Sequence, residues 1–183
     1  ADDVAATLHN LSSGSTTATF QSTDTDEVCV FCHTPHDAIA TGTINAPLWN
    51  HNAGATTFTS YTSGTIDMTI NAPSGVSLAC LSCHDGTVAL NDLANGPGTG
   101  DGAVTMDASG NTLTGTALVG TDLSNDHPVG VIWDTSTADG DSTGFKATSL
   151  VLFGTSSDTV ECATCHDPHD DTNGLFLAMS NAG

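Results

Sequence analysis

The sequence predicts a single, mostly coil domain with short helices and a few short strands, whose interior is filled by something other than side chains. Three observations predict this fold class. Helical periodicity is weak along the whole chain of 183 residues. Leu, Ile, Val and Phe together make up only about a fifth of the residues, which is enough for a thin core at most. All six cysteines recur in one short motif, which indicates what fills the interior.

The motif is C-x-x-C-H, the attachment signal of c-type haem. Two thiols form thioethers with the two vinyl groups of one porphyrin, and the adjacent His becomes the proximal ligand of the iron. Zinc would use such cysteine pairs in twos and leave one pair over, and disulfides do not require a His after each pair. We therefore expect three covalent haems c. The three copies are Cys29, Cys32 and His33; Cys80, Cys83 and His84; and Cys162, Cys165 and His166.

Five further histidines compete for the three distal positions. The alternative ligands are three methionines, at positions 68, 106 and 179, so bis-histidine haems of low potential are the default expectation. Our preferred distal ligands are His9, His36 and His127. His169 and His51 are held in reserve, and His51 has even odds of being structural. His36 and His169 each follow a proximal His by three residues, a spacing that would let them reach a neighbouring haem.

The remaining elements are predicted coarsely. We expect a turn or two of helix at each haem motif and short strands at 56–62, 129–133 and 149–153. Turn-forming residues dominate 96–115, which predicts a surface loop within the single domain 1–183. Residues 1–28 form an N-terminal arm rich in Ser and Thr.

The charge balance excludes several classes of function. The formal net charge is −20, from 21 Asp and Glu against one Lys. Such a chain cannot neutralise a row of phosphates, which excludes nucleic acid as a partner, and an anionic membrane surface repels it. No apolar run approaches the roughly 18 residues that span a bilayer. The first residues do not resemble a signal peptide, and a start at Ala1 is what a cleaved export signal would leave.

Haem propionates would add further negative charge to this chain. Arg, their usual partner, is absent, so we expect backbone N–H groups, Ser and Thr hydroxyls and water to bind them. A divalent cation such as Ca²⁺ at propionate–Asp clusters is a further expectation.

A family resemblance is carried by CVFCHTPH with APLWNH, then CLSCHDGTVAL, DLSNDHPVGV, and VECATCHDPHD with LFLAMSNAG. These segments resemble the small multihaem c-type cytochromes of bacterial extracellular electron transfer, which include tetrahaem outer-surface cytochromes that polymerise into conducting filaments. The resemblance runs from about His9 to Gly183. It implies a mostly coil fold, stacked and T-shaped haem pairs, bis-histidine ligation and a ligand donated between subunits. Relatives usually continue into a fourth C-x-x-C-H, which is missing here, so one distal ligand is left free or reassigned.

Two classes of function compete for such a chain. The first is an electron conduit, expected outside the cell or on its surface, in which identical subunits form a helical polymer and His9 ligates a haem of the neighbouring subunit. Its partners would be other redox proteins or extracellular acceptors, and a monomeric periplasmic shuttle is the variant without assembly. The second is a multihaem oxyanion reductase. An enzyme needs an open axial site and a cationic group for its substrate, and the spare histidines and missing arginines argue against it. We therefore expect no enzymatic activity.

Overall fold

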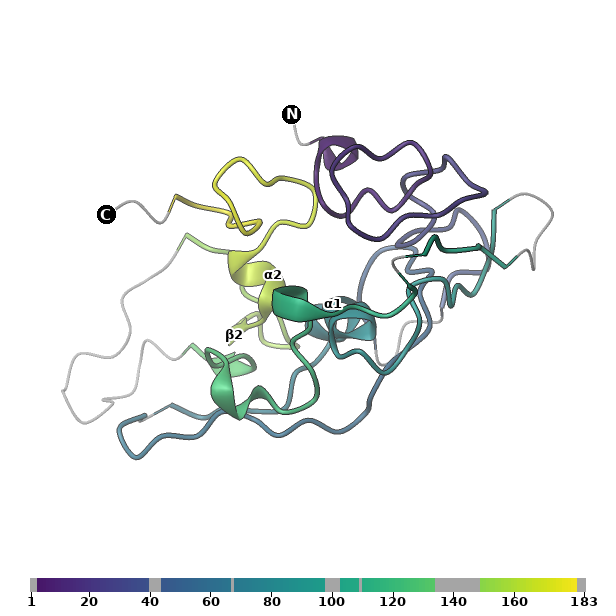
Figure 1. Cartoon of the computed structure of the whole chain (residues 1–183). Coiled ribbons are helices and arrows are strands. Elements are labelled where there is room, and N and C mark those ends of the chain that lie inside the picture. The colour runs from purple at the N-terminus through teal and green to yellow at the C-terminus, as the bar shows by residue number, and fades with distance from the viewer. Residues whose placement is uncertain are drawn as a thin grey trace.

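The computed structural model describes residues 3–39, 44–66, 68–97, 103–108, 110–133 and 149–180, and most of this chain is coil (Figure 1). Its two α-helices are α1 (Val76–His84) and α2 (Cys162–Cys165). Short 3-10 turns occur at η1 (Val4–Ala6), η2 (Gly115–Ala117) and η3 (Leu123–Asn125), and the strands are β1 (Val131–Ile132) and β2 (Thr159–Val160).

Helix formation at the haem motifs differs from one copy to the next. α1 contains the whole second motif, and α2 spans the cysteines of the third. The first motif forms a hydrogen-bonded turn without a helix, in which the His33 N–H donates to the Cys29 carbonyl at 2.8 Å. The prediction of a helical turn at each motif is therefore right for the second and third copies and wrong for the first.

The sheet is a single antiparallel pair. Val131 lies opposite Val160, and Ile132 lies opposite Thr159. The strand predicted at 129–133 is thus confirmed by β1. The other two predicted strands, at 56–62 and 149–153, contribute only isolated bridges, one of which joins Phe153 to Thr159. Strands this short cannot bury a face of their own, so the pair serves to join two distant segments of coil.

Buried apolar side chains of the described residues form two small clusters. One contains Phe20, Leu90 and Leu113, and the other contains Val30, Phe31 and Val104. Leu113 and Val104 belong to 96–115, so two side chains of this predicted surface loop are buried, while the rest of its described residues are exposed or half-buried. The physical reason is that the apolar residues scattered among its turn formers pack inward. Residues 98–102 and 109 lie outside the described residues.

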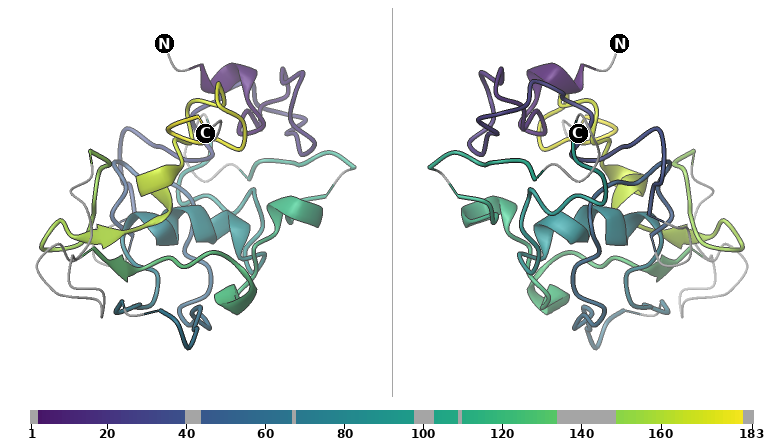
Figure 2. Two further views of the ribbon diagram at one scale, coloured as in Figure 1. Left: turned by 90° about the vertical axis from the view of Figure 1, so that its left-hand side faces the viewer. Right: turned by 90° about the vertical axis from the view of Figure 1, so that its right-hand side faces the viewer.

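The N-terminal arm folds back onto its own chain. Figures 1 and 2 show the arm beside the C-terminal segment, with α1 and α2 near the middle of the molecule. The Ser22 N–H donates to the Leu11 carbonyl and the Thr23 N–H to the Thr105 carbonyl, both at 2.8 Å. These bonds tie the arm to itself and to the second half of the chain.

No helix within the described ranges has the length and apolar character needed to cross a membrane.

Candidate functional site

A buried carboxylate joins the helices of the second and third motifs. Glu161 is 2% exposed and accepts hydrogen bonds from the hydroxyls of Ser74 (2.7 Å) and Ser77. The Ser77 hydroxyl oxygen also accepts the Cys162 N–H at 2.9 Å. Glu161 and Thr164 form a capping box, which explains why α2 begins at Cys162. The network therefore fixes α1 and α2 relative to each other.

The cysteines of different motifs lie close together in the interior. The side chains of Cys80 and Cys162 lie close enough to interact, and this interaction together with burial raises the pKa of Cys80. Burial also raises the pKa of Cys83, and it raises the pKa of Cys32 to about 11. A buried neutral thiol is a poor metal ligand and a poor nucleophile, because both roles require the thiolate. None of the six cysteines is in a disulfide.

The His of each motif is oriented by a backbone carbonyl from a loop further along the chain. Nδ1 of His33 lies 2.7 Å from the Pro47 oxygen, Nδ1 of His84 lies 2.7 Å from the Ala117 oxygen, and Nδ1 of His166 lies 2.8 Å from the Leu175 oxygen. A carbonyl oxygen only accepts, so Nδ1 must carry the proton in all three rings. This tautomer leaves Nε2 as the free lone pair, and metal-ligating histidines are typically held in this way.

These loops share a feature that the sequence analysis missed. Each places a large apolar side chain next to the carbonyl that orients the His. Leu48 follows Pro47, Leu118 follows Ala117, and Leu175 supplies its own carbonyl. The signal in the sequence is a short apolar run after each motif, namely PLW, ALV and LFL.

Each motif His faces a second His across a gap. His33 faces His169 at a ring-centroid distance of 6.2 Å, and His166 faces His127 at 6.2 Å. His84 faces His9 at 6.1 Å. The members of each pair are far apart in the sequence, so the fold brings them together.

The gap matches two imidazoles on opposite sides of one metal ion. A metal–imidazole bond is about 2.0 Å long and the ring centroid lies about 1.2 Å behind the nitrogen, so two such rings have centroids about 6.4 Å apart. All three pairs therefore have the separation that a metal ion bound between them would require.

The second His of each pair is also bound through Nδ1. Nδ1 of His9 lies 3.0 Å from the Pro168 oxygen, and Nδ1 of His127 lies 3.4 Å from the Pro128 oxygen. Nδ1 of His169 lies 3.4 Å from a carboxylate oxygen of Asp167. Burial lowers the pKa of His9 despite its bond to Pro168, which favours the neutral ring that a metal requires. No described group hydrogen-bonds to Nε2 in any of the six rings.

The placement changes two of the predicted ligand assignments. His36 is exposed, and no ring contact within the described chain brings another imidazole to it, so our preference for it is not supported. The reserve candidate His169 takes the position opposite His33. His9 lies against its own chain, so the expectation that it reaches a neighbouring subunit is also not supported. The arm can fold back because its hydroxyl and amide side chains satisfy its own backbone, as Thr17 does by donating to the Thr7 carbonyl at 2.7 Å.

His51 has a structural role. It is fully buried, its Nδ1 lies 3.0 Å from the Asn52 oxygen, and its Nε2 lies 2.9 Å from the Ala89 oxygen. Neither ring nitrogen is available to a metal. Of the two readings that the sequence left open, the structure favours the structural one.

Exposed apolar side chains gather around the facing rings. Leu175 is 80% exposed. A flat apolar group between two rings would cover the neighbouring side chains of this kind. Those next in sequence to a paired His, or in the loop that orients one, are Leu8, Leu48, Leu118, Val119 and Leu175.

The described chain contains no group of three or more His, Cys, Asp or Glu side chains that could hold a metal ion. Two histidines suffice for a bis-histidine haem, because the porphyrin supplies the other four nitrogens. The residues present therefore fit haem c, with two thiols and two imidazoles per site.

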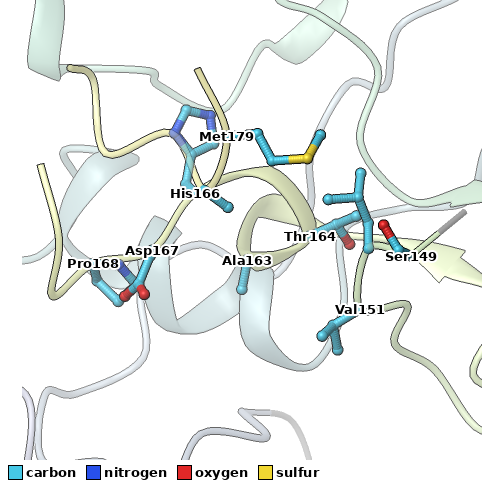
Figure 3. Close-up of a pocket in the computed structure, with 10 residues that line it drawn as sticks. Ser149, Val151, Ala163, Thr164, His166, Asp167, Pro168 and Met179 are labelled. Atoms are coloured by element: carbon cyan, nitrogen blue, oxygen red, sulfur yellow. The ribbon is translucent and has the colours of Figure 1, made fainter. Parts of the chain in front are cut away.

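A groove lies along α2. Its volume is about 460 Å³, and Figure 3 shows Val151 and Met179 flanking it beside Ala163 and Thr164. Ala163 and Thr164 separate the two cysteines of the third motif, and the cysteines themselves do not line the groove. The groove is thus distinct from the thiol face of α2.

The fold thus brings together three pairs of histidines, and one member of each pair belongs to a C-x-x-C-H motif. No protein-family model matches the sequence, and no curated protein is significantly similar to it.

Proposed function

We propose that this protein transfers electrons through three covalently attached c-type haems, each held by the thiols of one C-x-x-C-H motif and by two imidazoles on opposite faces. One observation carries the proposal: the His of every motif faces a second His at 6.1–6.2 Å. Nδ1 of five of these six rings lies at hydrogen-bond distance from a backbone carbonyl, and Nδ1 of His169 lies 3.4 Å from the Asp167 carboxylate. When bound, each haem supplies one reversible ferric–ferrous couple.

The ligand assignment follows the facing pairs. The first site uses His33 and His169, the second His84 and His9, and the third His166 and His127. Hydrogen bonds from Nδ1 to carbonyl and carboxylate oxygens make the opposite nitrogen a stronger donor. Stronger donors and the absence of Met ligation both favour the ferric state, which supports low potentials.

Both axial positions of each site are filled from this chain, which favours electron transfer over catalysis. A reductase needs an open position on one iron and a cationic side chain to bind an oxyanion. Here the only cationic side chain apart from the histidines is Lys146. We therefore propose no enzymatic activity.

The closeness of the sites supports a conduit. Cys80 and Cys162 are in contact, so the second and third haems would be attached side by side. Cys32 lies near enough to both Cys80 and Cys83 to raise their pKa values, which brings the first motif to the same region. Attachment points that converge in this way favour electron exchange between all three haems.

The biological setting rests on the resemblance to multihaem cytochromes of extracellular electron transfer. It supports an exported protein that acts outside the cell or on its surface and exchanges electrons with other redox proteins or extracellular acceptors. Polymerisation into a filament is the assembly that the resemblance implies, with a monomeric periplasmic shuttle as the alternative. All six axial ligands assigned here come from one chain, so contacts between subunits would have to come from other surfaces. Electron micrographs of the purified protein distinguish the two, because a helical polymer is directly visible.

A matched pair of histidines tests the haem assignment. His169 and His36 each lie three residues after a motif His, but only His169 faces one. We expect His169→Ala to retain three haems and to convert one iron to a high-spin form that binds carbon monoxide on reduction. His36→Ala should leave all three irons low-spin.

The denatured wild-type chain should have the mass of the 18.4-kDa polypeptide plus three haems, because thioether bonds survive denaturation. A mass with fewer haems would contradict the covalent assignment. Three low-spin irons in the His169→Ala variant, or a high-spin iron in the wild-type protein, would contradict the axial assignment.

A further inference from the structure

The three facing pairs differ in the angle between their ring planes. The planes are 12° apart for His33 and His169 and 15° apart for His127 and His166, so the rings of these two pairs are nearly parallel. The angle is 78° for His9 and His84, whose rings are nearly perpendicular. The second site is therefore geometrically distinct from the other two.

Phe176 and a backbone carbonyl fix the plane of the His9 ring. The Phe176 ring is stacked on His9, with centroids 4.2 Å apart and planes 22° apart. Nδ1 of His9 lies 3.0 Å from the Pro168 oxygen. A stacked ring and an in-plane hydrogen bond together leave the imidazole no free rotation about its bond to a metal.

The position of Phe176 is itself set by its backbone. Its φ is +56°, a conformation that L residues other than Gly, Asn and Asp rarely adopt. It is held there because the Phe176 N–H donates to Asp171 Oδ1 at 2.8 Å and the Phe176 carbonyl accepts the Asp167 N–H at 2.7 Å. A strained backbone with two well-formed hydrogen bonds indicates that the ring position matters to the site.

The angle between axial imidazoles has a direct electronic consequence. Each imidazole donates π electrons into the iron d orbital perpendicular to its ring plane. Parallel rings both raise the energy of the same d orbital, which separates it from the second d orbital available to the rings. The electron hole of the ferric ion occupies the raised orbital, so this separation stabilises the ferric state. Perpendicular rings raise both orbitals equally. The pair then stays nearly degenerate, the ferric state loses that stabilisation, and the orbital contribution to the g tensor becomes large.

We propose that the second site, His84 and His9, is electronically distinct from the other two, and that Phe176 is the positioning residue that makes it so. This inference rests on the proposed function, since it requires a haem between the two rings. Phe176 holds His9 perpendicular to His84, which gives this iron a large maximum g value and a more positive potential than parallel rings would give.

Electron paramagnetic resonance of the fully ferric protein tests the proposal. We expect two rhombic low-spin signals and one signal with a large maximum g value, each integrating to one third of the total spin. Three rhombic signals would overturn the inference while leaving the haem assignment intact. If low-spin ferric signals were absent altogether, the proposed function would fail as well.

Variants of Phe176 assign the signal to the second site. Phe176→Leu keeps an apolar side chain but removes the stacked ring, so the large-g signal should be lost and replaced by a third rhombic signal. The potential of one haem should shift to a more negative value in the same variant. Phe176→Tyr retains the ring and should retain the signal.

The matched control is Phe153→Leu. Within the described chain no ring contact links Phe153 to the facing histidines, so its change should leave all three signals in place. If Phe176→Leu folds with three haems and keeps the large-g signal, Phe176 is not the positioning residue. If Phe176→Leu lacks a haem, the Phe176→Tyr variant tests the role of the stacked ring instead. Because this variant retains the ring, loss of its large-g signal would contradict the proposal.

Discussion

Glu161 provides the sharpest test of how the second and third motifs are held together. Its carboxylate receives two hydroxyl hydrogen bonds in a nearly fully buried position. A hydrogen bond to a buried charged group contributes about 1.5–3 kcal/mol. Glu161→Ala removes both bonds and leaves two serine hydroxyls without their acceptor. We therefore expect it to lower the free energy of unfolding by about 3–5 kcal/mol.

The expected order of the variants follows from the same contacts. Glu161→Gln keeps one carbonyl oxygen as an acceptor, so it should destabilise by about 1–3 kcal/mol, less than Glu161→Ala. Ser77→Ala removes one bond to Glu161 and also the acceptor of the Cys162 N–H, and should fall in the same range as Glu161→Gln. The changes at positions 77 and 161 should be less than additive, because they remove the same hydrogen bond.

Urea unfolding of the haem-loaded protein, followed by circular dichroism, measures these differences as shifts of the midpoint at constant slope. Glu27→Gln and Glu27→Ala are the matched controls. Glu27 is the other glutamate of the chain, lies two residues before Cys29 and is exposed, so its substitution should leave the midpoint unchanged. Equal midpoints for Glu161→Ala and Glu27→Ala would refute the reasoning, because a buried network would then contribute nothing.

Two further predictions concern backbone strain and pH. Gly130 has a φ of +77°, and a Cβ added there would meet the Asn71 carbonyl oxygen, so Gly130→Ala should lower the free energy of unfolding by about 1–3 kcal/mol. A Cβ at Gly14 would meet nothing within 4 Å, so Gly14→Ala should leave the stability unchanged. Equal losses for the two variants in thermal unfolding would contradict this account. Burial lowers the pKa of His51 in the folded state below its value of about 6.5 in the unfolded chain. Below about pH 6.5 the unfolded state therefore binds more protons than the folded state. The contribution of His51 to stability is fully present above about pH 6.5 and is lost as the pH falls below that value. His51→Gln should reduce the slope of stability against pH in this window, and an unchanged slope would show that His51 does not contribute to it.

The local chemistry of the chain could be predicted from the sequence, but the long-range pairing could not. Spacing alone identifies the three motifs, and low apolar content predicts coil with little regular structure. Pairing of His84 with His9 depends on how the arm folds back, and no pattern in the first 28 residues specifies this. The buried Val104 was missed because one apolar residue among turn formers carries no periodic signal.

The choice between His36 and His169 illustrates the limit in detail. Both lie in the same local pattern, C-H-x-P-H, so spacing does not separate them. The difference lies in the variable residue. Asp167 accepts the His169 N–H at 2.9 Å and lies beside its Nδ1, whereas the Thr34 hydroxyl donates to the His36 carbonyl at 2.8 Å. A carboxylate two residues before a His can orient its ring for metal binding, and a threonine in that place does not.

The contact between Cys80 and Cys162 constrains the order in which the molecule matures. Two free thiols that come close in an oxidising compartment can be oxidised to a disulfide between motifs, and neither sulfur could then react with a vinyl group. Under our assignment, the chain must receive its second and third cofactors while still extended and collapse only afterwards. The packing that brings the redox centres together would therefore be the last step of biogenesis, and a chain that compacts too early would be trapped without them.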